Sequence, residues 1–408
     1  QTQGKSRFGP TQEHSYPGAQ LFINGASTAK YMIWDGIRAV DYLLTRKEVD
    51  PDRIGITGRS GGGTQSSHIA AFDERIKAAA PECYITTMEY QLKSGGPQDA
   101  EQNFPKGNQL GLDHADLLEV RAPKPTLMIT TTRDIFSIQG ARDTYEEAKL
   151  AYKAFDKLEN LLMVEDNAGH QSTQRNREAM YAFFQKHLGN PGNSKDEEVT
   201  IFPEEELYVT ETGQLATSVG SKFLFDVNST LAERNKEVLN GERSKGDEHL
   251  KGLKQKVQLI SGYTKSAENG KLIFSGQTEF ESYYLNKYLI EQPGDNILPL
   301  VAFVPKQTTN LSALYLDNIA DKESDDAYAV PIHLVKKGVM VIVPDLPGFG
   351  ELGPGYLKGD AYFDNTSYNQ WFAGILNGKS TVAIHAEAIA TLIQFCKEEM
   401  EWNNKEII

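Results

Sequence analysis

Ile54-Gly55-Ile56-Thr57-Gly58-Arg59-Ser60-Gly61-Gly62-Gly63 is the stretch that decides the fold. It sets a G-x-S-x-G pentapeptide, residues 58–62, between a short apolar run and a run of small residues that continues to Ala71. This pattern at a strand-to-helix junction is typical of a nucleophile elbow, a tight turn that lifts a serine hydroxyl clear of a sheet. Glycine tolerates the backbone angles of such a turn. We expect that a side chain at Gly58 or Gly62 would collide with the neighbouring strand or helix.

The flanking sequence favours this interpretation, because the pentapeptide by itself arises by chance. Asp50-Pro51-Asp52-Arg53 predicts a turn that leads into the strand. The helix beyond the pentapeptide begins without proline or a block of β-branched residues. The alternative is a glycine-rich turn that holds a structural serine, and residues elsewhere in the chain must decide between the two.

Length, charge and cysteine content exclude several classes of protein. The chain has 408 residues and a net charge of -14, with no basic cluster, so nucleic acid and anionic membrane surfaces are poor candidate partners. No apolar run reaches the ~18 residues of a membrane span, so we expect no membrane insertion. The only cysteines, Cys83 and Cys396, rule out a disulfide-dense scaffold and a cysteine zinc site. Because the chain begins Gln1-Thr2-Gln3, we expect a processed product or a piece of a longer protein.

Apolar runs alternate with amphipathic segments through the first part of the chain. Residues 1–24 are interpreted as a loop, and residues 84–118 as an irregular insertion that covers a site or lies on the surface. Helices are predicted over about 26–46, 63–71, 140–155 and 175–188, and strands over 54–57, 76–80, 125–130 and 160–164. This alternation predicts an α/β fold, a doubly wound and mostly parallel sheet.

The sequence after residue 192 has a different character. Residues 193–227 form an acidic connector with two short strand-like runs. A strongly charged helix is predicted from residue 228 to about 259. Further strands are predicted over 284–290, 298–304, 313–316 and 339–343.

The end of the chain repeats its beginning. Residues 22–54 align with residues 375–407, including an Asn-Gly pair and a Ser-Thr pair in each copy. We therefore predict the C-terminal half of one hydrolase copy at 1–192 and the N-terminal half of a second copy at 228–408. One further hypothesis is that strands within 298–343 pair with 54–57 and complete the open sheet edge.

Three residues have the types, the order and the placement of an α/β-hydrolase site. Ser60, Asp134 and His170 each follow a predicted strand, and parallel strands bring such loops to one edge. In this interpretation Ser60 is the nucleophile, His170 is the base and Asp134 orients the imidazole. The Gly61 N–H would supply one oxyanion donor. No metal or organic cofactor is predicted.

Four other features have alternative interpretations. His68 lies in the elbow helix and is expected to be a packed or surface histidine rather than a base. Residues 113–116, Asp-His-Ala-Asp, favour a loop or helix-cap role over a metal cluster. Asp166 could replace Asp134 as the orienting acid. Cys83 follows a strand, but a small buried residue is the favoured interpretation.

The motifs also resemble a known family. Residues 50–63, Gly96-Pro97-Gln98-Asp99-Ala100-Glu101-Gln102-Asn103, residues 132–137 and Gly169-His170 are similar to the bacterial acetyl xylan esterase type of α/β hydrolase, related to cephalosporin-C deacetylase and prolyl-oligopeptidase-like hydrolases. The resemblance implies a tandem-repeat protein truncated at both ends, with Ser60, Asp134 and His170 as its triad. It also implies export from a bacterium that degrades plant polysaccharide.

Three functions follow from these observations. The first is a serine carboxylesterase that removes acetyl groups from xylan or related carbohydrate esters. The second is a prolyl-oligopeptidase-like serine peptidase, which would use the same triad. The third concerns the second repeat, which could be a non-catalytic module that binds carbohydrate or dimerises.

Overall fold

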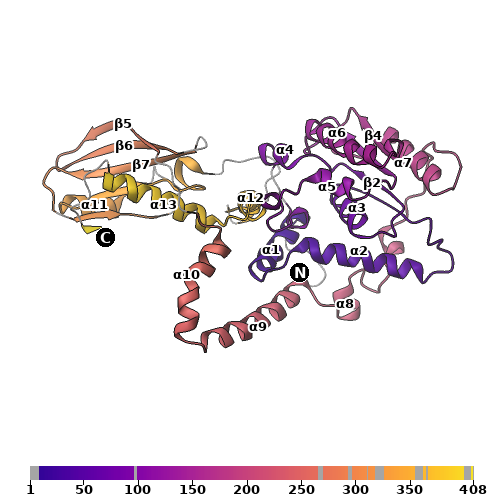
Figure 1. Ribbon diagram of the computed structural model, residues 1–408, viewed down its shortest axis with the longest axis horizontal. Helices are drawn as coiled ribbons and strands as arrows, with labels where there is room; N and C mark the ends of the chain where they lie inside the picture. Colours follow the sequence, from indigo (N-terminus) through magenta and orange to yellow (C-terminus); the bar gives the residue numbers. More distant parts are fainter. Residues whose placement is uncertain are drawn as a thin grey trace. The chain divides into compact units, whose positions relative to one another are not determined.

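The computed structural model describes residues 9–95, 99–264, 270–292, 296–309, 311–317, 326–353, 362–363, 366–398 and 406–407 (Figure 1). Contacts divide the chain into two compact units, one of residues 1–249 with 357–378 and one of residues 250–356 with 379–408. The boundaries of these units differ from the domain limits at residues 192 and 228 that the sequence predicts. Those limits stay predictions about the repeat.

The first unit is built on a four-stranded parallel sheet. Its strands are β1 (Gly55–Arg59), β2 (Ala78–Glu82), β3 (Thr126–Thr131) and β4 (Leu161–Asp166), and their spatial order is β1-β2-β3-β4. The strands β2 and β3 are buried along their whole length, as expected for a sheet covered on both faces. The predicted α/β fold with a mostly parallel sheet is confirmed, and the carboxyl ends of all four strands meet at one edge.

The predicted helices of this unit form with small shifts at their ends. They are α2 (Thr28–Leu44), α3 (Gly61–Phe72), α6 (Ile138–Ala154) and α7 (Gln174–His187). Three of them begin at a hydroxyl cap, because Ser27, Ser137 and Thr173 accept a hydrogen bond from a backbone N–H in the first turn.

The loop predicted for residues 1–24 is wrong over the described part. Residues Pro10–Ile23 form α1, although Pro17 lies inside the helix. Packing explains the difference: Leu21 is fully buried, and a Cβ at Gly18 would lie 2.5 Å from Ala100 Cβ. Tertiary contacts therefore outweigh the weak local helix propensity of this stretch.

The insertion over residues 84–118 contains short helices between its irregular parts. These are α4 (Met88–Lys93), the 3₁₀ turns η1 (Ala100–Gln102) and η2 (Asn108–Leu110), and α5 (His114–Glu119). Side-chain caps begin three of them, at Thr87, Asp99 and Asp113.

The first unit also includes elements from later in the chain. They are η3 (Leu158–Asn160), η4 (Glu204–Leu207), α8 (Leu215–Val219), α9 (Leu224–Arg243), β10 (Tyr362–Phe363), β11 (Thr366–Ser367) and α12 (Tyr368–Leu376). The two strand-like runs predicted within 193–225 are wrong, since this part of the chain has only η4, α8 and the start of α9. Helix α12 belongs here because Phe372 is fully buried and packs edge-on against Phe22.

The second unit is organised around a six-stranded mixed sheet. Its strands are β5 (Lys271–Glu279), β6 (Tyr283–Gln292), β7 (Asn296–Pro305), β8 (Leu311–Leu314), β9 (Met340–Pro344) and β12 (Glu406–Ile407), in the order β12-β8-β9-β7-β6-β5. Its helices are α10 (Asp247–Ser261), α11 (Ala329–Lys336) and α13 (Thr381–Glu398), with a 3₁₀ turn η5 (Gly350–Leu352). Figure 1 shows β5, β6 and β7 side by side.

Two predictions for the later part of the chain need correction. The single charged helix over 228–259 is two helices, α9 and α10. The hypothesis that strands within 298–343 complete the sheet at 54–57 is wrong, because β1 pairs with β2 alone among the described strands. No described helix has the length and apolar character needed to cross a membrane.

The glycines of the elbow have different packing. A Cβ at Gly58 would lie 2.5 Å from the Gly62 carbonyl oxygen, as predicted. A Cβ at Gly62 would meet nothing within 4 Å, so the predicted collision there is wrong. The close approach is at Gly63, where a Cβ would lie 2.3 Å from the Glu82 carbonyl oxygen of β2. Glycine at 63 therefore lets α3 pack onto β2.

We expect Gly63→Ala to lower the free energy of unfolding by about 1–3 kcal/mol or more, because backbone atoms must move to admit the methyl group. Gly62→Ala is the matched control, and it should be neutral or stabilising by up to about 1 kcal/mol, since alanine favours the helix and meets no atom. Urea unfolding of both variants measures the difference. Equal effects at the two positions would contradict this account of the packing.

Candidate active site

Ser60 lies at the junction of β1 and α3 in a strained conformation. Its φ is 60° and its ψ is -120°, a backbone region that residues other than glycine rarely adopt. Two hydrogen bonds hold the turn: the Ser60 N–H donates to the Glu82 carbonyl at 3.0 Å, and the Ser60 carbonyl accepts from the Thr64 N–H at 2.9 Å. The tight turn predicted from the pentapeptide is present.

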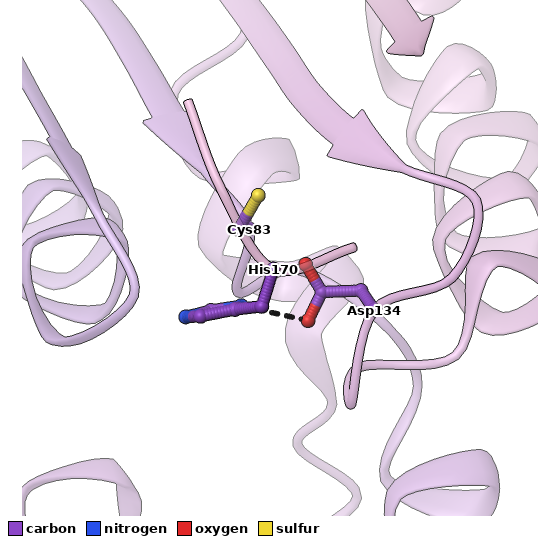
Figure 2. A group of neighbouring side chains, drawn as sticks. All are labelled: Cys83, Asp134 and His170. Atoms are coloured by element: carbon purple, nitrogen blue, oxygen red, sulfur yellow. Dashed lines mark hydrogen bonds and ion pairs between the residues drawn. The ribbon is translucent and has the colours of Figure 1, made fainter. Parts of the chain in front are cut away.

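Asp134 and His170 are in direct contact at the same edge of the sheet. His170 Nδ1 lies 2.8 Å from Asp134 Oδ1, drawn as a dashed line in Figure 2. The Asp134 carboxylate also accepts from the Thr131 hydroxyl at 2.8 Å and from the Phe136 N–H at 3.1 Å. The side chain of Asp134 is 2% exposed and that of His170 is 28% exposed. The acid is therefore enclosed, and the imidazole reaches the surface of the site.

The electrostatics of this pair favour an ionised acid. Burial opposes ionisation of Asp134, but the hydrogen bonds from His170, Phe136 and Thr131 outweigh it and lower the pKa of Asp134. A carboxylate at Nδ1 leaves the other ring nitrogen, Nε2, free to accept a proton.

The structure brings two of the three predicted site residues into contact. The third, Ser60, follows β1 at the same edge of the sheet and is separated from β3 and β4 by β2. Among the hydrogen bonds of the described residues, none joins the Ser60 hydroxyl to His170. The connection runs through β2: Ser60 N–H bonds to Glu82, and the next residue, Cys83, has its sulfur within 4.8 Å of Asp134 and His170 ligand atoms.

Asp166 does not take the place of Asp134. Its carboxylate accepts from the Asn167 N–H at 2.9 Å and hydrogen-bonds to Thr173, and these bonds lower its pKa. Of the two candidate acids that the sequence offered, Asp134 is the one that contacts His170.

Cys83 is a buried thiol, as expected. Its sulfur lies 3.6 Å from the Thr131 hydroxyl, and Figure 2 shows it beside the Asp134–His170 pair. Burial raises the pKa of Cys83 to about 12, so the thiol keeps its proton at neutral pH. A protonated thiol is a poor nucleophile and a poor metal ligand, although Cys83, Asp134 and His170 are close enough to surround an ion.

His68 and residues 113–116 have structural roles. The His68 ring is fully buried against Phe104 and Tyr84, with Nε2 at 3.4 Å from the Tyr84 hydroxyl. Burial, and then the nearby His114, lower the pKa of His68 to about 3. Asp113 caps α5, and His114 Nδ1 accepts from the Thr86 N–H at 3.0 Å. The expected packing and capping roles are confirmed.

A second group of ligand-type side chains is formed by His14, Asp99 and Glu101, whose ligand atoms lie within 4.8 Å of one another. His14 Nδ1 is 3.0 Å from both oxygens of Asp99, which is a direct hydrogen-bonding distance. Burial opposes protonation of His14, but the hydrogen bond to Asp99 and the nearby carboxylates raise its pKa. His14 and Asp99 therefore form a hydrogen-bonded pair, and the Glu101 carboxylate lies beside them.

Glu82 is a site residue that the sequence reasoning missed. It ends β2 and is 6% exposed, and its Oε1 is enclosed without a hydrogen-bond partner among the described residues. Burial raises its pKa, while Ser172, Arg59, Arg177 and His170 act in the opposite direction. The feature of the sequence that could have revealed it is a glutamate at the end of an otherwise apolar strand.

Gly61 is the first residue of α3, where the backbone N–H groups have no partner within the helix. Its N–H follows the elbow serine directly and lies at the positive end of the helix dipole. This geometry suits a developing negative charge next to Ser60.

Comparison with known proteins agrees with the fold. Residues 26–191 match the sequence model of the Prolyl oligopeptidase family. A Bacillus subtilis (strain 168) protein named as a hydrolase, YtaP, is 25% identical over 174 residues, which are 41% of this chain and 57% of YtaP. The chain thus spans little more than half the length of this relative.

Parts of the chain are also similar to solved structures. Methylesterase BT1017 is 26% identical, with a TM-score of 0.36 over 46% of this chain and 42% of that one. The glucuronoyl esterase catalytic domain Cip2_GE from Hypocrea jecorina is 20% identical, with a TM-score of 0.36 over 45% of this chain and 58% of that one.

A pH-dependent stability follows from the buried histidines. The folded pKa values of His68 and His114 are about 3 and about 4, whereas an unfolded histidine titrates near 6.5. Their stabilising contribution is complete above pH 6.5 and is lost as the pH falls toward 4. We expect the free energy of unfolding of this unit to fall by about 1.4 kcal/mol per pH unit for each such histidine.

His68→Leu should remove about half of that slope, and the same change at the exposed His333 should leave it intact. Urea unfolding between pH 4.5 and 7 measures the slopes in buffers that span those values. If His68→Leu keeps the full slope, the imidazole is not held neutral in the folded chain.

Proposed function

We propose that the chain is a serine carboxylesterase that removes acetyl groups from xylan or related carbohydrate esters. The premise is the α/β arrangement of the first unit and the match of residues 26–191 to the sequence model of the Prolyl oligopeptidase family. The observation that supports it best is the 2.8 Å contact of His170 with Asp134, at the edge of the sheet where the Ser60 elbow ends β1. Ser60, His170 and Asp134 form the proposed triad.

In the proposed reaction, the Ser60 hydroxyl oxygen attacks the acetyl carbonyl carbon and its proton passes to His170 Nε2. The carbonyl oxygen becomes an oxyanion that the Gly61 N–H stabilises. The ester C–O bond then breaks, the sugar oxygen takes the proton from His170, and an acetyl-serine remains. Water repeats the sequence: it loses a proton to His170, attacks the acetyl group and releases acetate as Ser60 regains its proton.

The role proposed for Asp134 follows from its environment. An ionised, enclosed carboxylate at Nδ1 holds the imidazole in one tautomer and stabilises the imidazolium that forms at each proton transfer. Thr131 and Phe136 hold that carboxylate in place.

The assignment of acetylated carbohydrate as substrate rests on the motif resemblance described above. A serine peptidase is the second candidate, because the family that matches residues 26–191 is named for oligopeptidase activity. Both reactions pass through an acyl-serine, so substrate comparison has to separate them.

We expect Ser60→Ala to lower the turnover of p-nitrophenyl acetate by about five to six decades without changing the fold, as loss of the nucleophile does in serine hydrolases. Cys83→Ser is the matched control, since it alters the other nucleophile-type side chain near His170 and should change turnover less than about tenfold. Steady-state kinetics and circular dichroism measure both. A folded Ser60→Ala protein with near-normal turnover would refute the assignment.

The wild-type chain should release acetate from acetylated xylan and from p-nitrophenyl acetate faster than it cleaves prolyl peptide amides. The physical reason is that an ester carbonyl is more electrophilic than an amide carbonyl, and that an amide nitrogen cannot leave the tetrahedral intermediate until it is protonated. Acetate release and amide cleavage are measured side by side at equal enzyme concentration. Amide turnover without ester turnover would select the peptidase alternative.

A further inference from the structure

A buried carboxylate lies against the elbow. Glu101, in η1, is 1% exposed, and its Oε1 lies 2.9 Å from the position that a Cβ at Gly61 would occupy. Gly61 directly follows Ser60, so this carboxylate is within a few ångströms of the proposed acyl-transfer site. The approach requires glycine at 61, because any larger residue there would displace Glu101.

Neighbouring side chains contact one carboxylate oxygen of Glu101, Oε2, and leave the other, Oε1, without a donor. Oε2 accepts from Gln65 Nε2 at 3.2 Å and lies 3.8 Å from His14 Nδ1. The Glu101 backbone N–H donates to Asp99 Oδ1 at 3.3 Å, which fixes the turn that carries the side chain. Oε1 has no hydrogen-bond donor among the described residues. It is not fully enclosed, so it keeps some access to solvent.

The position of Oε1 favours a role in binding a ligand. A carboxylate oxygen that has no donor in the protein but is not fully enclosed can accept a hydrogen bond from a group that binds there. A hydroxyl group of a bound substrate would supply that hydrogen bond.

We propose that Glu101 is a specificity-determining residue that accepts a hydrogen bond from a sugar hydroxyl neighbouring the ester. The ligand class is a pyranose with a free hydroxyl beside the acetylated one. This inference rests on the proposed function, since it names the residue that recognises the carbohydrate part of the same substrate.

The protonation of Glu101 is compatible with this role. Burial, and then the neighbouring Asp99, raise the pKa of Glu101 to about 7, while His14 and Gln65 act in the opposite direction. Both forms are therefore present near neutral pH. A hydroxyl can donate to the carboxylate or accept from the carboxyl group, so it matches either form.

The test compares Glu101→Gln with the wild-type chain of 408 residues, using two esters. Acetylated xylobiose offers neighbouring hydroxyls, and p-nitrophenyl acetate offers none. We expect kcat/KM for acetylated xylobiose to fall about 10- to 100-fold in Glu101→Gln, the usual effect of weakening a hydrogen bond to a charged group. For p-nitrophenyl acetate it should change less than about threefold.

The matched control is Glu119→Gln, which alters a partly exposed glutamate at the end of α5. It should leave kcat/KM unchanged for both esters. Thermal unfolding of all variants reports on a structural role. An equal loss for both esters in Glu101→Gln, with or without a lower Tm, would overturn the inference.

Calorimetric titration with xylobiose separates this inference from the proposed function. Weaker xylobiose binding by Glu101→Gln than by wild type supports the role of Glu101, even if the wild-type chain hydrolyses p-nitrophenyl acetate and no sugar ester. If the wild-type chain does not bind xylobiose, or if Glu101→Gln binds it equally well, the inference is wrong whatever the esterase assays give.

Discussion

The first unit depends on one backbone carbonyl, that of Glu82 at the end of β2. It accepts the Ser60 N–H at 3.0 Å, and it lies 2.3 Å from where a Cβ at Gly63 would be. The same group therefore fixes the strained turn and sets how closely α3 packs on the sheet. Because the turn is anchored at two points, the positive φ of Ser60 is maintained by its surroundings. A serine held in this way is half-buried at a strand end, without the freedom of an ordinary loop residue.

The pKa values of three buried carboxylates near this turn shift in different directions, because their hydrogen-bond partners differ. Asp134 receives three hydrogen bonds, and its pKa is lowered although it is enclosed. Glu82 and Glu101 have fewer donors, so burial dominates and raises the pKa of each. One group thus stays ionised next to His170, while the other two lie close to the elbow with incomplete hydrogen bonding. In the proposed reaction the first stabilises a cation, and Glu101 is left to recognise a hydroxyl.

Most elements of the first unit could be predicted from periodicity, since β3, β4, α6 and α7 lie within a few residues of their expected limits. The failures have different causes. Helix α1 contains proline and glycine and forms because Leu21 and Gly18 pack against distant residues. Strand β5 and helix α9 are largely exposed. Their sequences therefore show little of the apolar periodicity from which β5, and the break between α9 and α10, could be predicted. The collision expected at Gly62 occurs at Gly63, because helix geometry decides which glycine faces β2.

The sequence by itself determined the order Ser60, Asp134, His170, the strand that precedes each of them, and the parallel α/β arrangement that follows from their alternation. These are local properties, set by hydrophobic period and turn chemistry. Only the tertiary structure decided that His170 contacts Asp134 and not Asp166, that Cys83 stays a protonated buried thiol, and that Glu82 and Glu101 border the elbow. Such choices depend on which side chains meet across strands and loops that are far apart in the chain, and on the desolvation that burial imposes there.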